Sequence, residues 1–210
     1  MKKKKIIVFD FDKTLTYQDT ILPFFRFIAQ KNVYYPFKVG IYYFFMILNK
    51  LNLISNFTLK DIGIKLFLKG IDKEQIEKKS IEFSKKIKFN NLFKRLSFNE
   101  NNYKYFVITA SFEDYVKPIF PKNVKVIGSK IKYINNTPVG LLFNCYGEEK
   151  LYSLKSLNIN EIDILYTDSL SDLYLAKIAK KIYIVKKDKI FLCNGVEEFI
   201  RFFKHENTNV

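Results

Sequence analysis

The chain has 210 residues, of which 48% are hydrophobic, so it is long and apolar enough to bury a sizeable core. This composition excludes an intrinsically disordered chain. The formal net charge of +15 indicates attraction to anions, whether phosphorylated metabolites, anionic lipids or nucleic acid, and does not choose among them. The longest uncharged run in the aromatic part, residues 39–49, is too short for a membrane span, which needs about 20 residues.

Two features bear on the cellular compartment. The two cysteines, Cys145 and Cys193, have no metal-ligand spacing and indicate a reducing environment or no redox role. The basic run from Lys2 to Lys5 is followed by only four apolar residues before Asp10, which is too short for a signal peptide. We therefore expect a cytoplasmic protein.

The first predicted element is a buried strand over residues 5–9. It ends at Asp10, and Asp12 follows after one intervening residue. Two carboxylates at the end of a buried strand are costly unless a cation compensates them, and oxygen ligands suit Mg2+. The alternative is an ordinary strand-to-loop junction with two solvated acids, because this motif is short and common.

Residues 17–91 contain no strand pattern and predict a block of three or four helices. Thr20 is expected to cap the first helix, Thr58 to begin a capping box, and Asp72 to cap a later helix. The segment from Tyr34 to Leu53 is the most aromatic part of the chain. Either this helix packs inside a helical subdomain, or one of its faces rests on a membrane interface.

After residue 102 the pattern changes to alternating strands and helices, which predicts an open, mostly parallel sheet with helices on both faces. Ligands bind such sheets at the carboxyl ends of the strands. The expected strands are 103–108, 124–127, 162–166 and 182–185, with a hairpin of 131–134 and 139–143 turned at Asn135-Asn136; the expected helices are 113–120, 148–157, 171–180 and 196–203, followed by a tail from residue 205.

Polar side chains follow two of these later strands. Thr109 and Ser111 come at the end of the second core strand, where hydroxyls are well placed for phosphoryl oxygens, although Ser111 is also expected to cap the next helix. Asp168 ends a later strand and Asp172 begins the helix after it. Together with the two N-terminal acids, they are expected to gather at one edge of the sheet around a cation.

Lys150 lies in the first turn of a predicted helix, where the helix dipole disfavours a positive charge. An anionic site nearby would explain its position. In a chain this rich in lysine, a solvated side chain is the competing interpretation.

These motifs together resemble the haloacid-dehalogenase-like (HAD) phosphatases, and among them the phosphoserine-phosphatase-like subfamily. Asp10-x-Asp12-x-Thr14, then Thr109, Lys150 and finally Asp168-Ser-Leu-Ser-Asp172 match the family's four motifs in order and spacing. The resemblance implies a Rossmann-like three-layer α/β core with a parallel sheet, formed by residues 1–16 and 92–210, and an inserted all-helical cap, formed by residues 17–91. Lys13 and Thr167 stand where glycine is commoner, and we expect them to affect only loop shape.

The resemblance also implies a mechanism for phosphomonoester hydrolysis. Asp10 would attack phosphorus and form an aspartyl-phosphate, while Asp12 would act as the general acid and then as the base. Thr14, Thr109, Ser111 and Lys150 would serve phosphate binding, with Thr14 also fixing the loop that carries Asp12. Mg2+ would be held by Asp10, the backbone carbonyl of Asp12, and Asp168. Asp172 would act through water or by orienting Lys150.

The substrate is expected to be a small phosphorylated amine or alcohol of the ethanolamine phosphate, serinol phosphate or phosphoserine type. Asp19 lies nine residues after Asp10, at the offset where phosphoserine phosphatases contact the substrate's amino group; a turn residue is the alternative. Their cap arginine has no counterpart in residues 57–70, which favours a substrate without a carboxylate. The rival is a lipid phosphate of the phosphatidylglycerophosphate type, hydrolysed by an enzyme in peripheral contact with an anionic membrane.

A basic nucleic-acid-binding protein is a distant third possibility. Charge and aromatic content fit it loosely, but no binding motif is present and acids at the strand ends would repel phosphate. We therefore expect no nucleic-acid partner.

Overall fold

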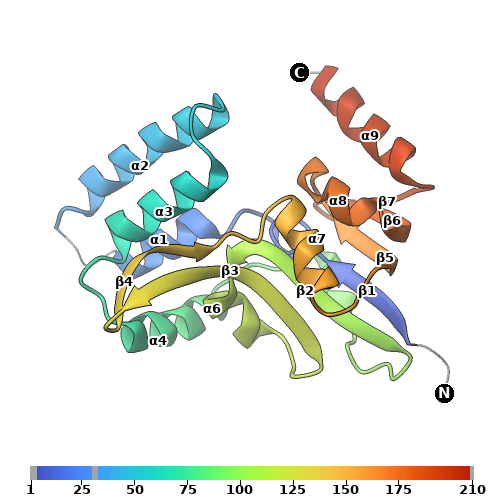
Figure 1. Cartoon of the computed structure of the whole chain (residues 1–210), viewed down its shortest axis with the longest axis horizontal. Coiled ribbons are helices and arrows are strands. Elements are labelled where there is room, and N and C mark those ends of the chain that lie inside the picture. The colour runs from blue at the N-terminus through green and yellow to red at the C-terminus, as the bar shows by residue number, and fades with distance from the viewer. Residues whose placement is uncertain (1–3, 30–32, 209–210) are drawn as a thin grey trace.

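The computed structural model describes residues 4–29 and 33–208. Its centre is a seven-stranded sheet in the order β4-β3-β2-β1-β5-β6-β7 (Figure 1). The five inner strands are parallel, and β4 and β7 pair antiparallel at the two edges. The strands are β1 (Lys5–Phe9), β2 (Tyr103–Phe112), β3 (Val124–Ile134), β4 (Thr137–Phe143), β5 (Ile162–Thr167), β6 (Ala179–Lys186) and β7 (Lys189–Cys193).

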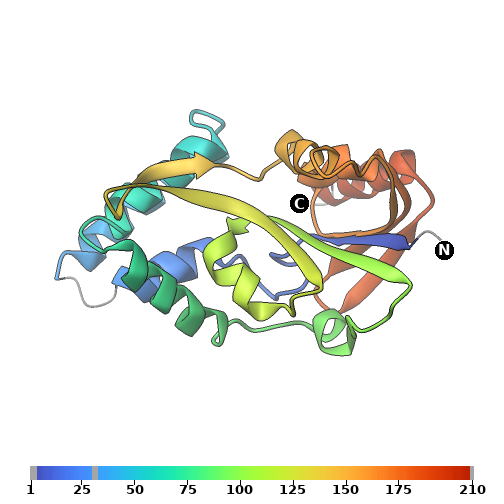
Figure 2. The same ribbon diagram turned by 60° about the horizontal axis from the view of Figure 1, so that its bottom comes forward.

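Alternating side chains of β1 supply the two faces of the sheet, as the two-residue period of a strand requires. Ile7 and Phe9 enter one hydrophobic cluster, and Val8 enters the other. The second cluster is closed by α7 (Glu148–Lys155), α8 (Leu173–Ala176) and α9 (Val196–Thr208). The first is covered by α5 (Asn91–Arg95) and α6 (Glu113–Val116) together with the N-terminal helices (Figure 2). Short 3-10 helices at Lys117–Ile119 and Leu170–Asp172 complete the core. The predicted three-layer α/β fold is confirmed.

The first four helices between β1 and β2 lie beyond one end of the sheet, beside the β3–β4 hairpin (Figure 1). They are α1 (Ile21–Ala29), α2 (Tyr35–Lys50), α3 (Asn56–Phe67) and α4 (Lys73–Ser84), and we refer to them as the cap. The cap has an aromatic core in which Phe25 contacts both Tyr42 and Phe67. The side chain of Asp61 accepts a hydrogen bond of 2.8 Å from the backbone N–H of Leu141 and so joins the cap to β4.

The helix starts of the cap were predicted with mixed success. Asp72 caps α4 by accepting from the backbone N–H of Gln75, as expected. The expected start at Thr58 is wrong, because Ser55 is the N-cap of α3 and accepts from the backbone N–H of Thr58. Thr20 precedes α1, but its hydroxyl contacts the side chains of Asp12, Ser111 and Tyr115.

The C-terminal part differs from the prediction in three places. β7 was not expected; it pairs with β6 across a tight turn in which Lys187 has a φ of 58°. The expected helix 171–180 ends at Ala176, because Ala179 already pairs with Ile162 in the sheet. The expected tail from residue 205 is instead part of α9, which reaches Thr208. Within the two described segments, none of the helices is both long and apolar enough to cross a bilayer.

Candidate active site

The predicted site residues converge at the carboxyl ends of three neighbouring strands. Asp10 follows β1, Thr109 lies near the end of β2 and Asp168 follows β5, and these strands are adjacent and parallel. The cavity at this edge has a volume of about 190 Å³. It is lined from the core by Asp10, Asp12, Thr109, Ala110, Tyr146, Lys150, Asp168, Ser169 and Ser171, from the connecting loop by Lys13 and Asp19, and from the cap by Ile21, Asn56 and Lys60.

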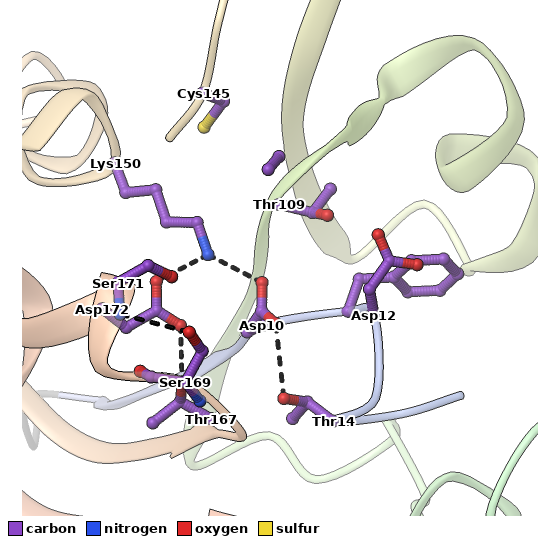
Figure 3. A network of polar contacts seen from close by, with 12 residues as sticks. Asp10, Asp12, Thr14, Thr109, Cys145, Lys150, Thr167, Ser169, Ser171 and Asp172 are labelled. Atoms are coloured by element: carbon purple, nitrogen blue, oxygen red, sulfur yellow. Dashed lines mark hydrogen bonds and ion pairs between the residues drawn. The ribbon is translucent and has the colours of Figure 1, made fainter. Parts of the chain in front are cut away.

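Lys150 forms the centre of the charge network on the core side (Figure 3). Its side chain is 2% exposed, and Nζ donates to Asp10 Oδ1 at 2.7 Å and to Asp172 Oδ1 at 2.6 Å. Burial opposes the positive charge, but the two carboxylates outweigh it and raise the pKa of Lys150 above its usual value. Asp172 is not part of the cavity lining, and its contact with Lys150 fixes the direction of that side chain.

The other oxygen of Asp10 faces Thr14. Thr14 Oγ1 lies 3.3 Å from Asp10 Oδ2 and 3.3 Å from Asp168 Oδ1, so one buried hydroxyl is shared by two carboxylates. Thr14 does not line the cavity, and its position supports a role in fixing the carboxylates more than direct contact with phosphate. Burial, followed by repulsion from Asp10 and Asp172, raises the pKa of Asp168 to about 8.

The donor set fits a hard divalent cation. The buried carboxylate of Asp10 and the half-buried carboxylate of Asp168 are held beside one hydroxyl and repel each other, and a cation between them would relieve that repulsion. Across the described chain, no group of three His, Cys, Asp or Glu side chains is close enough to hold a metal ion. The predicted ligand set has two carboxylate side chains, those of Asp10 and Asp168, and the backbone carbonyl of Asp12, and it stays a prediction.

The side chain of Asp12 is directed away from Asp10 and takes no part in the contacts of Lys150 (Figure 3). Its Oδ1 accepts from the backbone N–H of Thr20 at 2.9 Å and from the Thr20 hydroxyl at 2.7 Å, and its Oδ2 accepts from the Ser111 hydroxyl. Burial raises the pKa of Asp12 to about 6, although these hydrogen bonds oppose the shift. A carboxyl group with this pKa can both give and take a proton near neutral pH.

The sequence had suggested that Ser111 caps the following helix, but this expectation is wrong. The N-cap of α6 is Phe112, without a side-chain hydrogen bond, and the Ser111 hydroxyl accepts from Tyr115 while donating to Asp12. Ser111 is buried and lies outside the cavity lining, whereas Thr109 lines it and accepts from the backbone N–H of Ser111. Thr109 therefore faces the cavity, whereas Ser111 contacts Asp12 from outside the cavity lining.

Two residues that were expected to affect only loop shape make specific contacts. Thr167 donates its hydroxyl proton to Asp172 Oδ2 at 2.6 Å and so helps to orient the partner of Lys150. Lys13 has a φ of 57°, which explains why glycine suits this position, and its Nζ pairs with Asp19 at 2.6 Å. Asp19 thus lies at the rim of the cavity, in an exposed ion pair.

Sequence reasoning missed Lys60 of α3. Its side chain is 2% exposed, and Nζ donates to Ala110 O at 2.6 Å, to Asn144 Oδ1 at 2.6 Å and to Ser129 Oγ at 3.3 Å. All three acceptors are uncharged, and burial lowers the pKa of Lys60 to about 7. A signal was present, since Lys60 shares the buried stripe of α3 with Ile64 and Phe67 at spacings of four and seven residues.

Structural comparison finds similar folds at low sequence identity. A protein of unknown function from Bordetella pertussis Tohama I has 15% identity and a TM-score of 0.68, with 86% of this chain and 89% of that chain covered. A phosphoserine phosphohydrolase-like protein from Francisella tularensis subsp. tularensis SCHU S4 has 17% identity and a TM-score of 0.62, covering 94% and 99%. A phospho-aspartyl intermediate analogue of phosphoserine phosphatase has 19% identity and a TM-score of 0.58, covering 96% and 99%.

No curated protein sequence matches the chain significantly. The family described as haloacid dehalogenase-like hydrolase matches residues 7–177, a range that contains every site residue described above. This match spans most of the 210 residues and includes the strand ends at Asp10, Thr109 and Asp168. The chain therefore belongs to the haloacid dehalogenase-like hydrolase family.

Proposed function

We propose that this protein is a Mg2+-dependent phosphomonoester hydrolase that works through an aspartyl-phosphate on Asp10. The observation that carries the proposal is the arrangement around that carboxylate. Lys150 and Thr14 contact different oxygens of Asp10, and Asp12 lines the same cavity with a raised pKa. One carboxylate is thus held by fixed donors beside a second that can exchange a proton, as nucleophilic and general acid catalysis require.

The reaction has two steps. In the first, an oxygen of Asp10 bonds to phosphorus, the bond from phosphorus to the ester oxygen breaks, and Asp12 protonates the departing oxygen. In the second, Asp12 takes a proton from water as the water oxygen attacks phosphorus, and the bond to Asp10 breaks to release inorganic phosphate. Lys150 and Thr109 bind non-bridging oxygens, so that negative charge on the substrate is balanced as it approaches Asp10.

The cation would be held by Asp10, Asp168 and the backbone carbonyl of Asp12. When bound, it supplies positive charge that stabilises the phosphoryl oxygens and relieves repulsion among the carboxylates. Asp172 and Thr167 are not ligands in this scheme; they keep Lys150 directed at Asp10.

The cavity supports a small substrate. Its volume of about 190 Å³ suits a phosphoryl group with a short substituent, such as ethanolamine phosphate, serinol phosphate or phosphoserine. Asp19 at the rim is placed to attract an amino group once its pairing with Lys13 opens. The described part of the lining contains no arginine for a carboxylate, which favours phosphorylated amines and alcohols.

A lipid phosphate is the second candidate substrate. The exposed apolar side chains of the cap favour it, because the exposed Phe57 lies on α3 between Asn56 and Lys60, which both line the cavity. A long-chain substrate would leave its acyl part outside the cavity and present only the headgroup phosphate.

The first experiment is phosphate release from p-nitrophenyl phosphate with and without Mg2+. We expect metal-dependent hydrolysis that Asp10→Asn abolishes, while Asp72→Asn, which retains a capping side chain far from the cavity, leaves the rate unchanged. Hydrolysis that survives Asp10→Asn would contradict the mechanism. Salt-sensitive DNA binding without hydrolysis would instead support the nucleic-acid-binding alternative. A panel of phosphorylated amines, alcohols and lysophospholipids then separates the substrate classes.

A further inference from the structure

Helix α2 has two apolar stripes, and the described part of the chain covers one of them. On the inner side, Tyr42 is buried against Phe25 and Phe67. The outer stripe consists of Phe37, Phe44, Ile47 and Leu51, spaced by seven, three and four residues and between 57% and 70% exposed. Figure 1 shows α2 as the outermost helix of the cap, with α3 on its inner side. The outer stripe therefore presents large apolar side chains to solvent.

Further exposed apolar residues follow α2 in the sequence. After α2, the chain adds Leu53, which is 68% exposed, and Phe57 in the first turn of α3. We call the six residues Phe37, Phe44, Ile47, Leu51, Leu53 and Phe57 the α2 face. Asn56, next to Phe57, lines the catalytic cavity. The last residue of the α2 face, Phe57, is thus the sequence neighbour of a residue that lines the cavity.

All charged residues of α1 and α2 are basic. The sequence has no aspartate or glutamate between Asp19 and Asp61, a stretch that contains all of α1 and α2. Basic residues on these helices include Arg26, whose guanidinium lies over the ring of Tyr43, as well as Lys38 and the exposed Lys50. A partner that covers this face must therefore accept apolar side chains and bring negative charge.

A second copy of the chain does not meet that requirement. Two α2 faces in contact would bring basic residues together without any acidic residue from α1 or α2 to pair with them. The stripe also covers about two heptads, whereas coiled-coil pairing needs about three or four. An anionic bilayer meets both requirements, because apolar side chains enter the acyl boundary while basic side chains contact the headgroups.

We propose that the α2 face docks this protein on the surface of an anionic membrane. The docking would keep the cap end of the catalytic cavity close to the layer of lipid headgroups. Membrane docking does not depend on the proposed hydrolysis, because none of the six side chains of the α2 face lines the catalytic cavity.

Vesicle flotation tests the docking without any substrate. The full-length protein is mixed with phosphatidylcholine vesicles that contain about 30% phosphatidylglycerol, or with pure phosphatidylcholine vesicles. We expect flotation with the anionic vesicles only, weakened by high salt, and at least about tenfold weaker binding for the double variant Phe44→Ser with Ile47→Ser. The matched control is Ile134→Ser with Leu142→Ser, which removes similarly exposed side chains from the β3–β4 hairpin.

Three results would overturn the proposal: no flotation of the unmodified protein with anionic vesicles, equal loss of binding in the control, or unchanged binding of the Phe44 and Ile47 double variant. A concentration-dependent dimer that this variant abolishes, in a protein that does not bind vesicles, would assign the α2 face to a second copy. Hydrolysis of p-nitrophenyl phosphate by the same samples keeps the two proposals separate. We expect the double variant to retain the unmodified rate, and absent hydrolysis with intact flotation would refute only the proposed catalytic function.

Discussion

The two sides of the catalytic cavity each bury a lysine, and their surroundings are opposite. On the core side, Lys150 contacts two carboxylates, and its pKa is raised. On the cap side, the hydrogen-bond acceptors of Lys60 among the described residues are a backbone carbonyl, an amide oxygen and a hydroxyl, and its pKa is lowered to about 7. Both side chains are 2% exposed. The difference therefore comes from the charge of the partners and not from the depth of burial.

Because of this contrast, we expect the two lysines to have different functions in the cavity. Lys150 is a permanent cation whose charge is already balanced when the cavity is empty. The pKa of Lys60 lies near neutral pH, so its amine can gain or lose a proton there. Its hydrogen bonds to Ala110 and Asn144 also join α3 of the cap to the ends of β2 and β4. An anion entering the cavity would favour the protonated form of Lys60, because opposite charge raises the pKa of a buried amine.

Replacing Lys150, on the core side of the cavity, should cause the largest losses of stability and of turnover. Lys150→Met leaves two buried carboxylates without their shared cation, so we expect about 3–5 kcal/mol less unfolding free energy and at least about a thousandfold lower turnover. Urea denaturation and p-nitrophenyl phosphate hydrolysis measure the two effects. Lys155→Met, on the exposed side of the same helix, is the control and should change neither. Turnover within about tenfold of the unmodified protein would remove Lys150 from phosphate binding.

On the cap side, the lowered pKa of Lys60 should make the free energy of unfolding depend on pH. The folded pKa of Lys60, about 7, lies below the ordinary lysine value, so the unfolded state binds the extra proton between about pH 7 and 10.5. The contribution of Lys60 to the free energy of unfolding is therefore lowest below pH 7, and it rises as the pH increases from about 7 to 10.5. Comparison of the unmodified protein with Lys60→Met by urea denaturation should show a relative gain on the order of 3 kcal/mol from pH 6.5 to 9.5.

Lys69→Met, also in the cap but exposed, controls for this pH comparison and should give a flat difference. A flat difference for Lys60→Met as well would mean that Lys60 stays protonated throughout, and the contrast with Lys150 would disappear.

A smaller effect is expected where the cap meets β4. Asp61→Ala removes the acceptor of the Leu141 backbone N–H and should lower the unfolding free energy by about 1–2 kcal/mol. Asp61→Asn keeps an acceptor oxygen in the same position and should lose less. Equal losses in thermal or urea denaturation would indicate that the charge, through the pairing with Lys65, matters more than the hydrogen bond.

The smallest effect on stability is expected at the rim between the two sides. The pairing of Lys13 with Asp19 is exposed, so Asp19→Asn should change the unfolding free energy by less than about 0.5 kcal/mol. The KM for phosphorylated amines should nevertheless rise several-fold, because the amide cannot attract an ammonium group as a carboxylate does. A KM for phosphorylated alcohols that rises equally would assign Asp19 to loop structure and not to substrate selection.

Local chemistry and the order of elements made much of this site predictable. An apolar strand that ends in acids, repeated in a parallel sheet, must bring its carboxyl ends to one edge, so the convergence of Asp10 and Asp168 followed from the pattern alone. Lys150 was noticeable because a cation in the first turn of a helix is unfavourable without an anion nearby. Asp72 capped its helix as expected because a cap depends on neighbours within one turn.

Contacts between distant segments were decided only by the tertiary structure. The partners of Lys60 come from β2, β3 and the end of β4, and no local pattern around residue 60 reveals that they are uncharged. Ser111 was expected to cap a helix, but Asp12, 99 residues away in the chain, takes its hydroxyl proton. Sequence patterns determined which elements form and where charges gather, because those depend on neighbouring residues. Folding decided which polar group satisfies which other, because that depends on side chains that only packing brings together.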